Sequence, residues 1–145
     1  MSLEACCEIT EFNDVGYAPI IDFQSWRVAM LNYIDELEPD QINNFQCHLE
    51  TDEVFVLLAG RCILFLADVD NDNQIIKIYA VEMQPYRAYN IKQGIFHTHT
   101  LTEEAKVLII ENRDTSDANS PKIMIDQKIN QQLIELTAEH WITRP

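Results

Sequence analysis

The stretch at residues 46–60 constrains the fold of this chain more than any other. It reads QCHLETDEVFVLLAG, in which two candidate metal ligands, His48 and Glu53, flank a polar turn and precede a strongly apolar segment. That segment is rich in β-branched, aromatic and aliphatic residues, which is typical of a strand buried on both faces. Because side chains alternate along a strand, we expect Glu53 to share its face with Phe55 and Leu57.

The strand that leads into this turn adds a third polar side chain. Alternation places Gln46 and His48 on one face and sends Cys47 to the other. Gln46, His48 and Glu53 are therefore expected to gather at the mouth of a β structure. A metal site built from them lacks one further ligand.

The segment at residues 94–99, GIFHTH, offers that ligand. His97 and His99 are two positions apart, so on a strand they share a face. An imidazole from this segment would complete a nitrogen and oxygen ligand set suited to zinc, iron, manganese or nickel.

Both segments resemble the motifs of the cupin superfamily. The first cupin motif ends with a His, three or four residues, a Glu, six residues and a Gly, and His48, Glu53 and Gly60 follow this spacing. In the second motif two residues separate a Gly from a His, as they do between Gly94 and His97.

The resemblance extends over roughly residues 40–112 and implies an all-β fold, the double-stranded β-helix or jelly-roll barrel of cupins. It also implies that His48, Glu53 and His97 bind a divalent transition metal, and that Gln46 stands in the position of the fourth ligand of the family. A looser resemblance to ureidoglycolate lyase-like cupins implies a small polar acid as substrate.

Further side chains are candidates for catalysis and substrate binding. In an enzyme, His99 would move a proton, since an imidazole pKa lies near working pH, and Glu53 is the second catalytic candidate. His99 has three other interpretations: a partner that orients a ligand, a fourth ligand, or an exposed strand residue. Gln46 is a substrate-binding amide, a weak ligand or a core hydrogen-bonding group. Arg87 and Tyr89 are expected to bind a substrate carboxylate. The ordinary alternative for Arg87 is a position on the surface.

Short apolar runs separated by polar turns predict an antiparallel barrel or sandwich along most of the chain. We expect a single domain over residues 1–145, with a barrel core at about 26–125 and a C-terminal helix at about 126–140. Asp126 is positioned to cap that helix, whose apolar stripe would dock on the barrel or on a second subunit. Residues 8–12 alternate in polarity and predict a short edge strand.

Composition excludes several partners. A net charge of −14 argues against nucleic acid and anionic membrane surfaces, which attract clustered Lys and Arg. No apolar run approaches the roughly 18 residues that a membrane-spanning helix needs. The four cysteines, Cys6, Cys7, Cys47 and Cys62, have no zinc-binding spacing and are expected to be reduced thiols in a cytoplasmic protein.

Three functions remain open from the sequence. The first is a metal-dependent cupin enzyme with lyase, isomerase or hydrolase chemistry on a small polar acid or sugar derivative. The second is a metal-free binding or catalytic cupin. The third is a structural or sensor module whose interior is plugged by Phe55, Leu57 and Phe96. In each case a homodimer is expected, because the outward side chains of residues 54–58 need cover.

Overall fold

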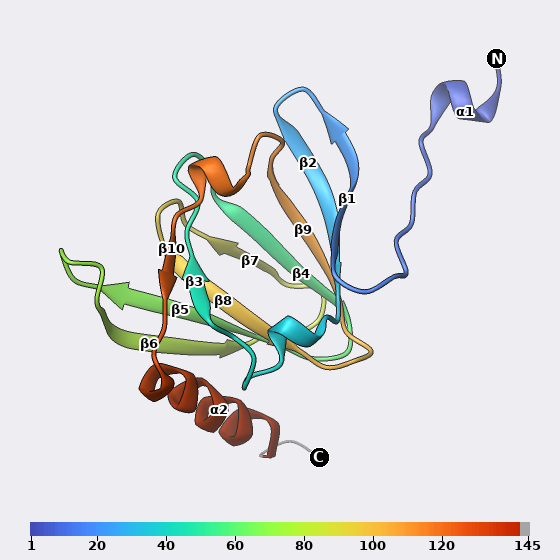
Figure 1. The fold of residues 1–145 in the computed structure, drawn as a ribbon. Helices are drawn as coiled ribbons and strands as arrows, with labels where there is room; N and C mark the ends of the chain where they lie inside the picture. Colours follow the sequence, from blue (N-terminus) through green and yellow to red (C-terminus); the bar gives the residue numbers. More distant parts are fainter. Residues whose placement is uncertain (143–145) are drawn as a thin grey trace.

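Two antiparallel five-stranded sheets form the centre of the computed structural model, which describes residues 1–142 (Figure 1). The first sheet has the order β1-β2-β9-β4-β7 and the second the order β10-β3-β8-β5-β6. The strands are β1 (Tyr17–Phe23), β2 (Trp26–Asn32), β3 (Asn44–Gln46), β4 (Glu53–Ala59), β5 (Cys62–Val69), β6 (Ile75–Glu82), β7 (Ala88–Ile91), β8 (Phe96–Leu101), β9 (Lys106–Asn112) and β10 (Lys122–Met124). The all-β prediction is confirmed.

An apolar core fills the space between the sheets. Phe55 and Leu57 of β4 pack there with Cys62 and Leu64 of β5, and each of the four is at most 2% exposed. The expected alternation of β4 is confirmed, because Glu53 is buried on the same inward face. Burial of these side chains supplies the main driving force for closing the sandwich.

A tight turn joins β4 to β5 and brings the two sheets together. Gly60 adopts a φ of +67°, a region in which residues with a side chain are strained. A Cβ atom at this position would also lie 2.5 Å from the Cα atom of Ala105, closer than side-chain atoms approach a backbone. The turn therefore requires glycine on both grounds.

The C-terminal helix α2 (Gln127–Ile142) covers the outer face of the second sheet (Figure 1). Its first turn is capped as predicted, since the Asp126 carboxylate accepts a hydrogen bond of 2.9 Å from the Ile129 amide. Leu133 is fully buried against a cluster that includes Phe45 and Phe65. The prediction that this helix docks on the outside of the barrel is confirmed.

The N-terminal part of the chain differs from the prediction. Residues 8–12 do not form a strand in the described structure, and the sheet begins only with β1. An alternating pattern makes a strand only where a neighbouring strand pairs with its backbone, and these residues have no such neighbour. The segment instead extends away from the sheets and ends in the short helix α1 (Leu3–Cys6) (Figure 1). In β1 the register is irregular between Pro19 and Ile21, which an edge strand tolerates.

The outer face of the first sheet remains uncovered among the described residues, since α2 lies on the second sheet only (Figure 1). Trp26 of β2 is 43% exposed and Ile110 of β9 is 38% exposed. Val28 and Val54 are the strand partners of Ile110 and lie half-buried beside it. The two sheets therefore differ in how their outer faces are covered.

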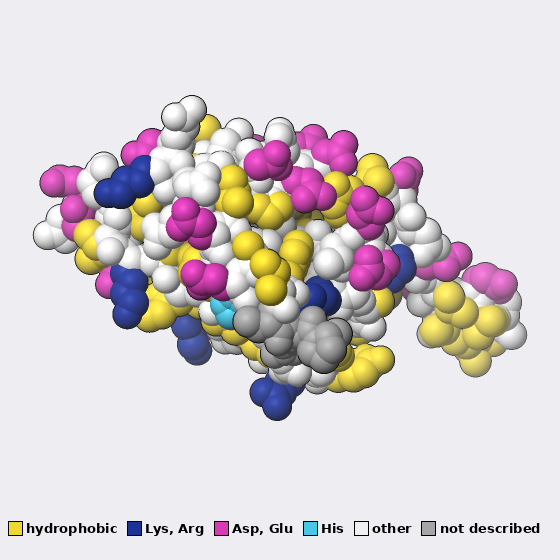
Figure 2. All heavy atoms as spheres, turned by 90° about the horizontal axis from the view of Figure 1, so that it is seen from below, with side chains coloured by type: hydrophobic (Ala, Val, Ile, Leu, Met, Phe, Trp, Pro, Cys, Tyr) yellow, Lys and Arg dark blue, Asp and Glu magenta, His cyan; other side chains and the backbone are white. Residues whose placement is uncertain are grey.

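The surface carries the acidic excess of the sequence. Figure 2 shows acidic side chains spread over the face seen from below, with fewer basic ones among them. Within residues 1–142, no helix is both long and apolar enough to cross a membrane.

Candidate metal centre

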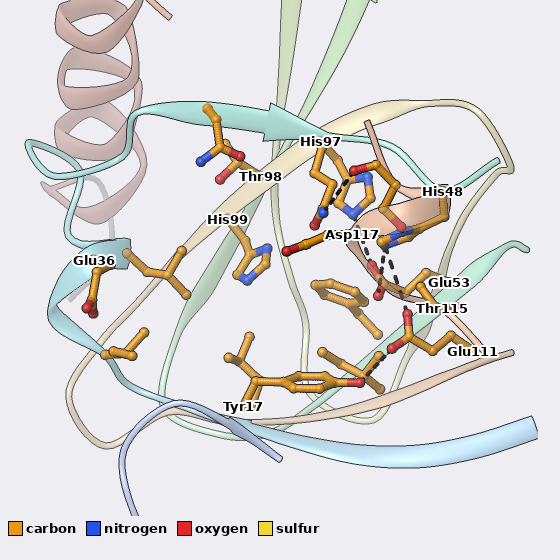
Figure 3. Close-up of a pocket in the computed structure, with 18 of the residues that line it drawn as sticks. Tyr17, Glu36, His48, Glu53, His97, Thr98, His99, Glu111, Thr115 and Asp117 are labelled. Atoms are coloured by element: carbon orange, nitrogen blue, oxygen red, sulfur yellow. Dashed lines mark hydrogen bonds and ion pairs between the residues drawn. The ribbon is translucent and has the colours of Figure 1, made fainter. Parts of the chain in front are cut away.

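A cavity of about 640 Å³ lies between the two sheets (Figure 3). Phe55 lines its wall and does not close it. Phe96 points the other way, because it precedes the inward-facing His97 by one position and packs in the outer cluster under α2. The expectation that Phe55, Leu57 and Phe96 plug the interior is therefore wrong.

The predicted ligands meet at one end of this cavity. The Nε2 atom of His97 lies 2.9 Å from Oε1 of Glu53, and Nε2 of His48 lies 3.3 Å from Oε2 of the same carboxylate. Within these three buried residues, ligand atoms lie within 4.8 Å of one another (Figure 3). The two sequence segments thus come together as expected.

Backbone contacts between the two segments fix this meeting. In the β3–β8 ladder, Gln46 is the partner of His97. Just beyond, the Gly94 amide donates a hydrogen bond of 2.8 Å to the His48 carbonyl. Gly94 has a φ of +78° in the turn that leads into β8. The geometry of this turn therefore sets the distance between the two imidazoles.

Hydrogen bonds on the far side of each imidazole define its tautomer. His97 Nδ1 lies 2.9 Å from the Ile95 carbonyl, which only accepts, so Nδ1 carries the hydrogen. His48 Nδ1 lies 2.7 Å from the Ser120 hydroxyl, which itself donates to Asn119 Oδ1. When the Ser120 hydroxyl donates to Asn119, His48 Nδ1 is the donor in its contact with Ser120. In their neutral forms, both rings direct the Nε2 lone pair into the cluster.

These lone pairs face the oxygens of a buried carboxylate, so a cation or protons must lie between them. Burial opposes ionisation of Glu53, but hydrogen bonds with His48 and His97 outweigh it and hold the Glu53 pKa well below its usual value. Two oriented imidazoles and one anionic carboxylate match the ligands that zinc, iron, manganese and nickel bind. The contacts behind the rings are those that fix metal-binding histidines. The donor set therefore fits a divalent metal.

A second buried carboxylate stands beside this group. Glu111 Oε1 accepts hydrogen bonds from the Tyr17 hydroxyl at 2.6 Å and from Arg27 Nη2 at 2.7 Å. Its Oε2 atom is buried without a hydrogen-bond partner among the described residues and lies 3.9 Å from His48 Nε2. Burial, and then the neighbouring Glu53, raise the pKa of Glu111 to about 7.

Glu111, Tyr17 and Arg27 were not among the site residues predicted from the sequence. A signal for Glu111 was present, because alternation along β9 places it on the inward face with Val107 and Ile109. A carboxylate at an inward position of an otherwise apolar strand requires a partner. Tyr17 and Arg27 offered no comparable signal, since only the pairing of β2 with β1 and β9 brings them to Glu111.

His99 lines the cavity but is not part of the cluster of ligand atoms. Its ring packs edge-on against Phe55, with centroids 5.2 Å apart, and its Nδ1 atom is buried without a hydrogen-bond partner in the described part of the chain. Burial, followed by the proximity of His97, lowers the pKa of His99 to about 4. The imidazole is therefore neutral at pH 7, and the expected pKa near working pH is not found.

The remaining candidates lie in different places. Gln46 lines the cavity, and its amide nitrogen donates a hydrogen bond of 3.2 Å to the Ser120 carbonyl. Tyr89 of β7 lines a separate, apolar groove, and its hydroxyl accepts a hydrogen bond from the Gln84 amide. Arg87 is exposed just before β7. The structure does not place Arg87 or Tyr89 among the residues that line the cavity.

Comparison with known proteins finds no matching family model and no matching curated protein. Solved structures do match. A cupin-2 domain protein from Shewanella frigidimarina is 23% identical, with a TM-score of 0.51 over 70% of this chain and 85% of its own. Pac13 from Streptomyces, a nucleoside dehydratase solved with uridine, is 10% identical, with a TM-score of 0.54 over 83% of this chain and 88% of its own.

A third match is the QdtA 3,4-ketoisomerase from Thermoanaerobacterium thermosaccharolyticum, solved as a double mutant with TDP. It is 15% identical, with a TM-score of 0.51 over 66% of this chain and 64% of its own. At these identities the likeness concerns the fold. The fold is that of the cupin superfamily, as the sequence motifs implied.

Proposed function

We propose that this cupin-fold chain is a metal-dependent enzyme that acts on a small polar metabolite by lyase, isomerase or hydrolase chemistry. The observation that carries the proposal is the buried group of two Nε2 lone pairs and one carboxylate, formed by His48, His97 and Glu53 at the end of a 640 Å³ cavity. Such a group is costly to bury unless a cation or protons occupy it. The adjoining cavity gives a small ligand access to it.

Each residue has a defined task in this proposal. When bound, a divalent ion supplies Lewis-acid polarisation of a substrate carbonyl or hydroxyl. Glu53 holds the ion together with the two imidazoles, and Phe55 forms an apolar wall that excludes water. His99, being neutral, lines the cavity and can donate or accept a hydrogen bond with a substrate there. Gln46 adds an amide group to the lining of the cavity from the second sheet.

The charge of the cavity narrows the substrate class. Four carboxylates, Glu36, Glu53, Glu111 and Asp117, line it. Arg27 is the one Lys or Arg among the described lining residues, and it already binds Glu111. A neutral hydroxylated compound such as a sugar derivative fits this balance best, and an acid fits only if it reaches the metal. Uridine and TDP in the related folds support a small polar ligand.

Metal analysis tests the proposal. The full chain, purified without chelator, is expected to contain one transition metal ion per chain, and the His97→Ala variant none. Elemental analysis measures both. The proposal is overturned if the wild-type protein contains no metal and also takes up none when zinc, iron, manganese and nickel are added.

A metal-free cupin is the second candidate, and one distance favours it. His97 Nε2 and Glu53 Oε1 are 2.9 Å apart, which is the length of a direct hydrogen bond, so protons can take the place of a metal. In that case Glu53 and the imidazoles form a base and acid pair. The protein would then be stabilised against heating by its ligand in the presence of EDTA.

The uncovered face of the first sheet supports a homodimer. An apolar surface on the outer face of this sheet is formed by exposed Trp26 and Ile110 together with half-buried Val28 and Val54. The Ile110→Lys variant is expected to be a monomer of 16.8 kDa, and the wild type to have twice that mass, in light-scattering measurements. Ile76→Lys, at an exposed position of β6, is the control that stays dimeric. A monomeric wild type contradicts this part of the proposal.

We also propose a reducing, cytoplasmic location. Cys6, Cys7, Cys47 and Cys62 are all free thiols, and two of them are exposed. Free thiols persist where the cellular environment is reducing. Thiol titration of freshly purified protein is expected to find four reactive groups after unfolding.

A further inference from the structure

The oxygen atoms of Glu111 have contrasting environments. Oε1 is saturated by the Tyr17 hydroxyl at 2.6 Å, by Arg27 Nη2 at 2.7 Å and by Arg27 Nε at 3.1 Å. Oε2 is buried, has no hydrogen-bond partner among the described residues, and lies 3.9 Å from His48 Nε2. Figure 3 shows the carboxylate directed at the same point as His48 and Glu53. An acceptor atom of this kind is rare in a folded protein and calls for an explanation.

We infer that Glu111 is the fourth protein ligand of the metal centre and binds the ion through Oε2. The centre then has two imidazoles and two carboxylates, from His48, His97, Glu53 and Glu111. This inference rests on the proposed metal-dependent function and adds a ligand that lies outside both sequence motifs. It also gives the buried Oε2 atom a ligand role, whereas in the metal-free protein the Glu111 carboxylate interacts with the neighbouring Glu53.

Gln46, which the motif places at the fourth position, is less suited to this role. Its amide nitrogen donates to the Ser120 carbonyl, so the side chain is already held by the segment that precedes β10. A neutral amide oxygen is also a weaker ligand than a carboxylate for a divalent ion. A carboxylate from β9 therefore takes the place of the imidazole that the cupin motif has at the position of Gln46.

Arg27 and Tyr17 act as positioning residues for this ligand. Arg27 also donates to the carbonyls of Arg113 and Thr115, so its guanidinium is fixed on three sides and is not available to a substrate. Together with the Tyr17 hydroxyl it holds Oε1 and leaves Oε2 directed inward. Contacts of this kind orient metal-binding carboxylates and affect affinity.

The ligand set has a consequence for metal choice. Two carboxylates add oxygen donors and negative charge, which favour manganese and ferrous iron relative to a site with three imidazoles. The charges of the two carboxylates neutralise a divalent ion. When the ion is absent, the positive charge of Arg27 offsets part of the repulsion between the two carboxylates. We therefore expect the site to bind Mn²⁺.

Calorimetric titration of the demetallated full chain with Mn²⁺ tests the inference. Glu111→Gln is expected to weaken Mn²⁺ binding by about 100-fold, because it removes a charged ligand while its amide oxygen still accepts from Tyr17 and Arg27. Glu36→Gln is the matched control, since Glu36 lines the same cavity away from the cluster, and it should stay within about threefold of wild type (Figure 3). Gln46→Ala should do the same.

Two further measurements keep the inference testable if Glu111→Gln folds poorly. Glu111→Asp retains the charge but is one methylene too short to reach Arg27 and the ion together, so it should weaken Mn²⁺ binding by about 10-fold. Visible absorption of the Co²⁺-loaded protein should change in both Glu111 variants and not in Glu36→Gln, because the bands report the ligands of the ion.

The outcomes separate this inference from the proposed function. If His97→Ala abolishes Mn²⁺ binding while both Glu111 variants bind within threefold of wild type and give the wild-type Co²⁺ spectrum, the inference is overturned and the metal centre stands. If the wild type binds no metal ion, both are overturned. Strong losses in both His97→Ala and the Glu111 variants support the four-ligand centre.

Discussion

The two ends of the cavity use the same types of residue in opposite ways. His97 and His99 come from one strand, β8, and both line the cavity. At the first end, His97 has both ring nitrogens engaged, by the Ile95 carbonyl and by Glu53. At the other end, His99 has a buried nitrogen without a partner in the described residues and lies against Phe55 (Figure 3).

The surroundings of a histidine, rather than its place in a strand, therefore decide its role. The His97 end contains two carboxylates, Glu53 and Glu111, which suits a cation. The His99 end is apolar around a neutral ring, which suits the body of an uncharged ligand. We therefore assign metal binding to the first end and substrate contact to the second.

The largest expected effect is on metal affinity, and it distinguishes His97 from His99. His97→Ala should weaken Mn²⁺ binding by at least about 100-fold, since it removes a ligand, whereas His99→Ala should change it by less than about threefold. Calorimetric titration measures both. Equal losses in the two variants would show that the ends are not distinct.

A smaller effect concerns the pH dependence of stability. The pKa of His99 falls from 6.5 to about 4 on folding, so between these values the unfolded chain binds more protons than the folded one. Stability from this group is therefore present above pH 6.5 and is lost as the pH falls toward 4. Relative to His99→Phe, the metal-free wild type should lose about 2 kcal/mol of unfolding free energy between pH 7 and pH 4.5.

Urea unfolding of the two proteins in EDTA at both pH values measures this difference. His99→Phe is the suitable variant, because it keeps an aromatic ring against Phe55 and removes only the titrating nitrogens. Parallel pH dependences in the two proteins are inconsistent with a His99 whose pKa is lowered to about 4 on folding.

The smallest expected effect lies behind the His97 end. Ser120→Ala removes the hydroxyl that accepts from His48 Nδ1 at 2.7 Å, so the ring loses its fixed tautomer and orientation. Metal affinity should fall by about tenfold, the lower part of the range for residues that orient a ligand. Mn²⁺ titration measures it, with a thermal melt to show that the fold is retained. Unchanged affinity would mean that the other contacts suffice to hold His48.

Much of the fold and half of the site could be predicted because they depend on local patterns. Alternation along residues 53–57 and 97–99 placed the inward side chains correctly, and the motif spacing brought His48, Glu53 and His97 together. Such features need only the period of a strand and one family motif.

The remaining half depends on which strands become neighbours. Glu111 meets Tyr17 and Arg27 only because β9 pairs with β2, and β2 with β1, and no local pattern specifies that order. Strand order also keeps Tyr89 away from the site. Its strand, β7, lies at the edge of the first sheet, so Tyr89 faces the interior there but lines another groove. A strand pattern also failed at residues 8–12, where no neighbour pairs with the backbone.

Anomalous diffraction from crystals of the wild-type chain grown with Mn²⁺ tests the central claim most directly. We predict one anomalous peak per chain within about 2.3 Å of Nε2 of His48, Nε2 of His97 and an oxygen of Glu53. A map without a peak at that position, in which His97 Nε2 stays 2.9 Å from Glu53 Oε1, would contradict a metal centre in this protein.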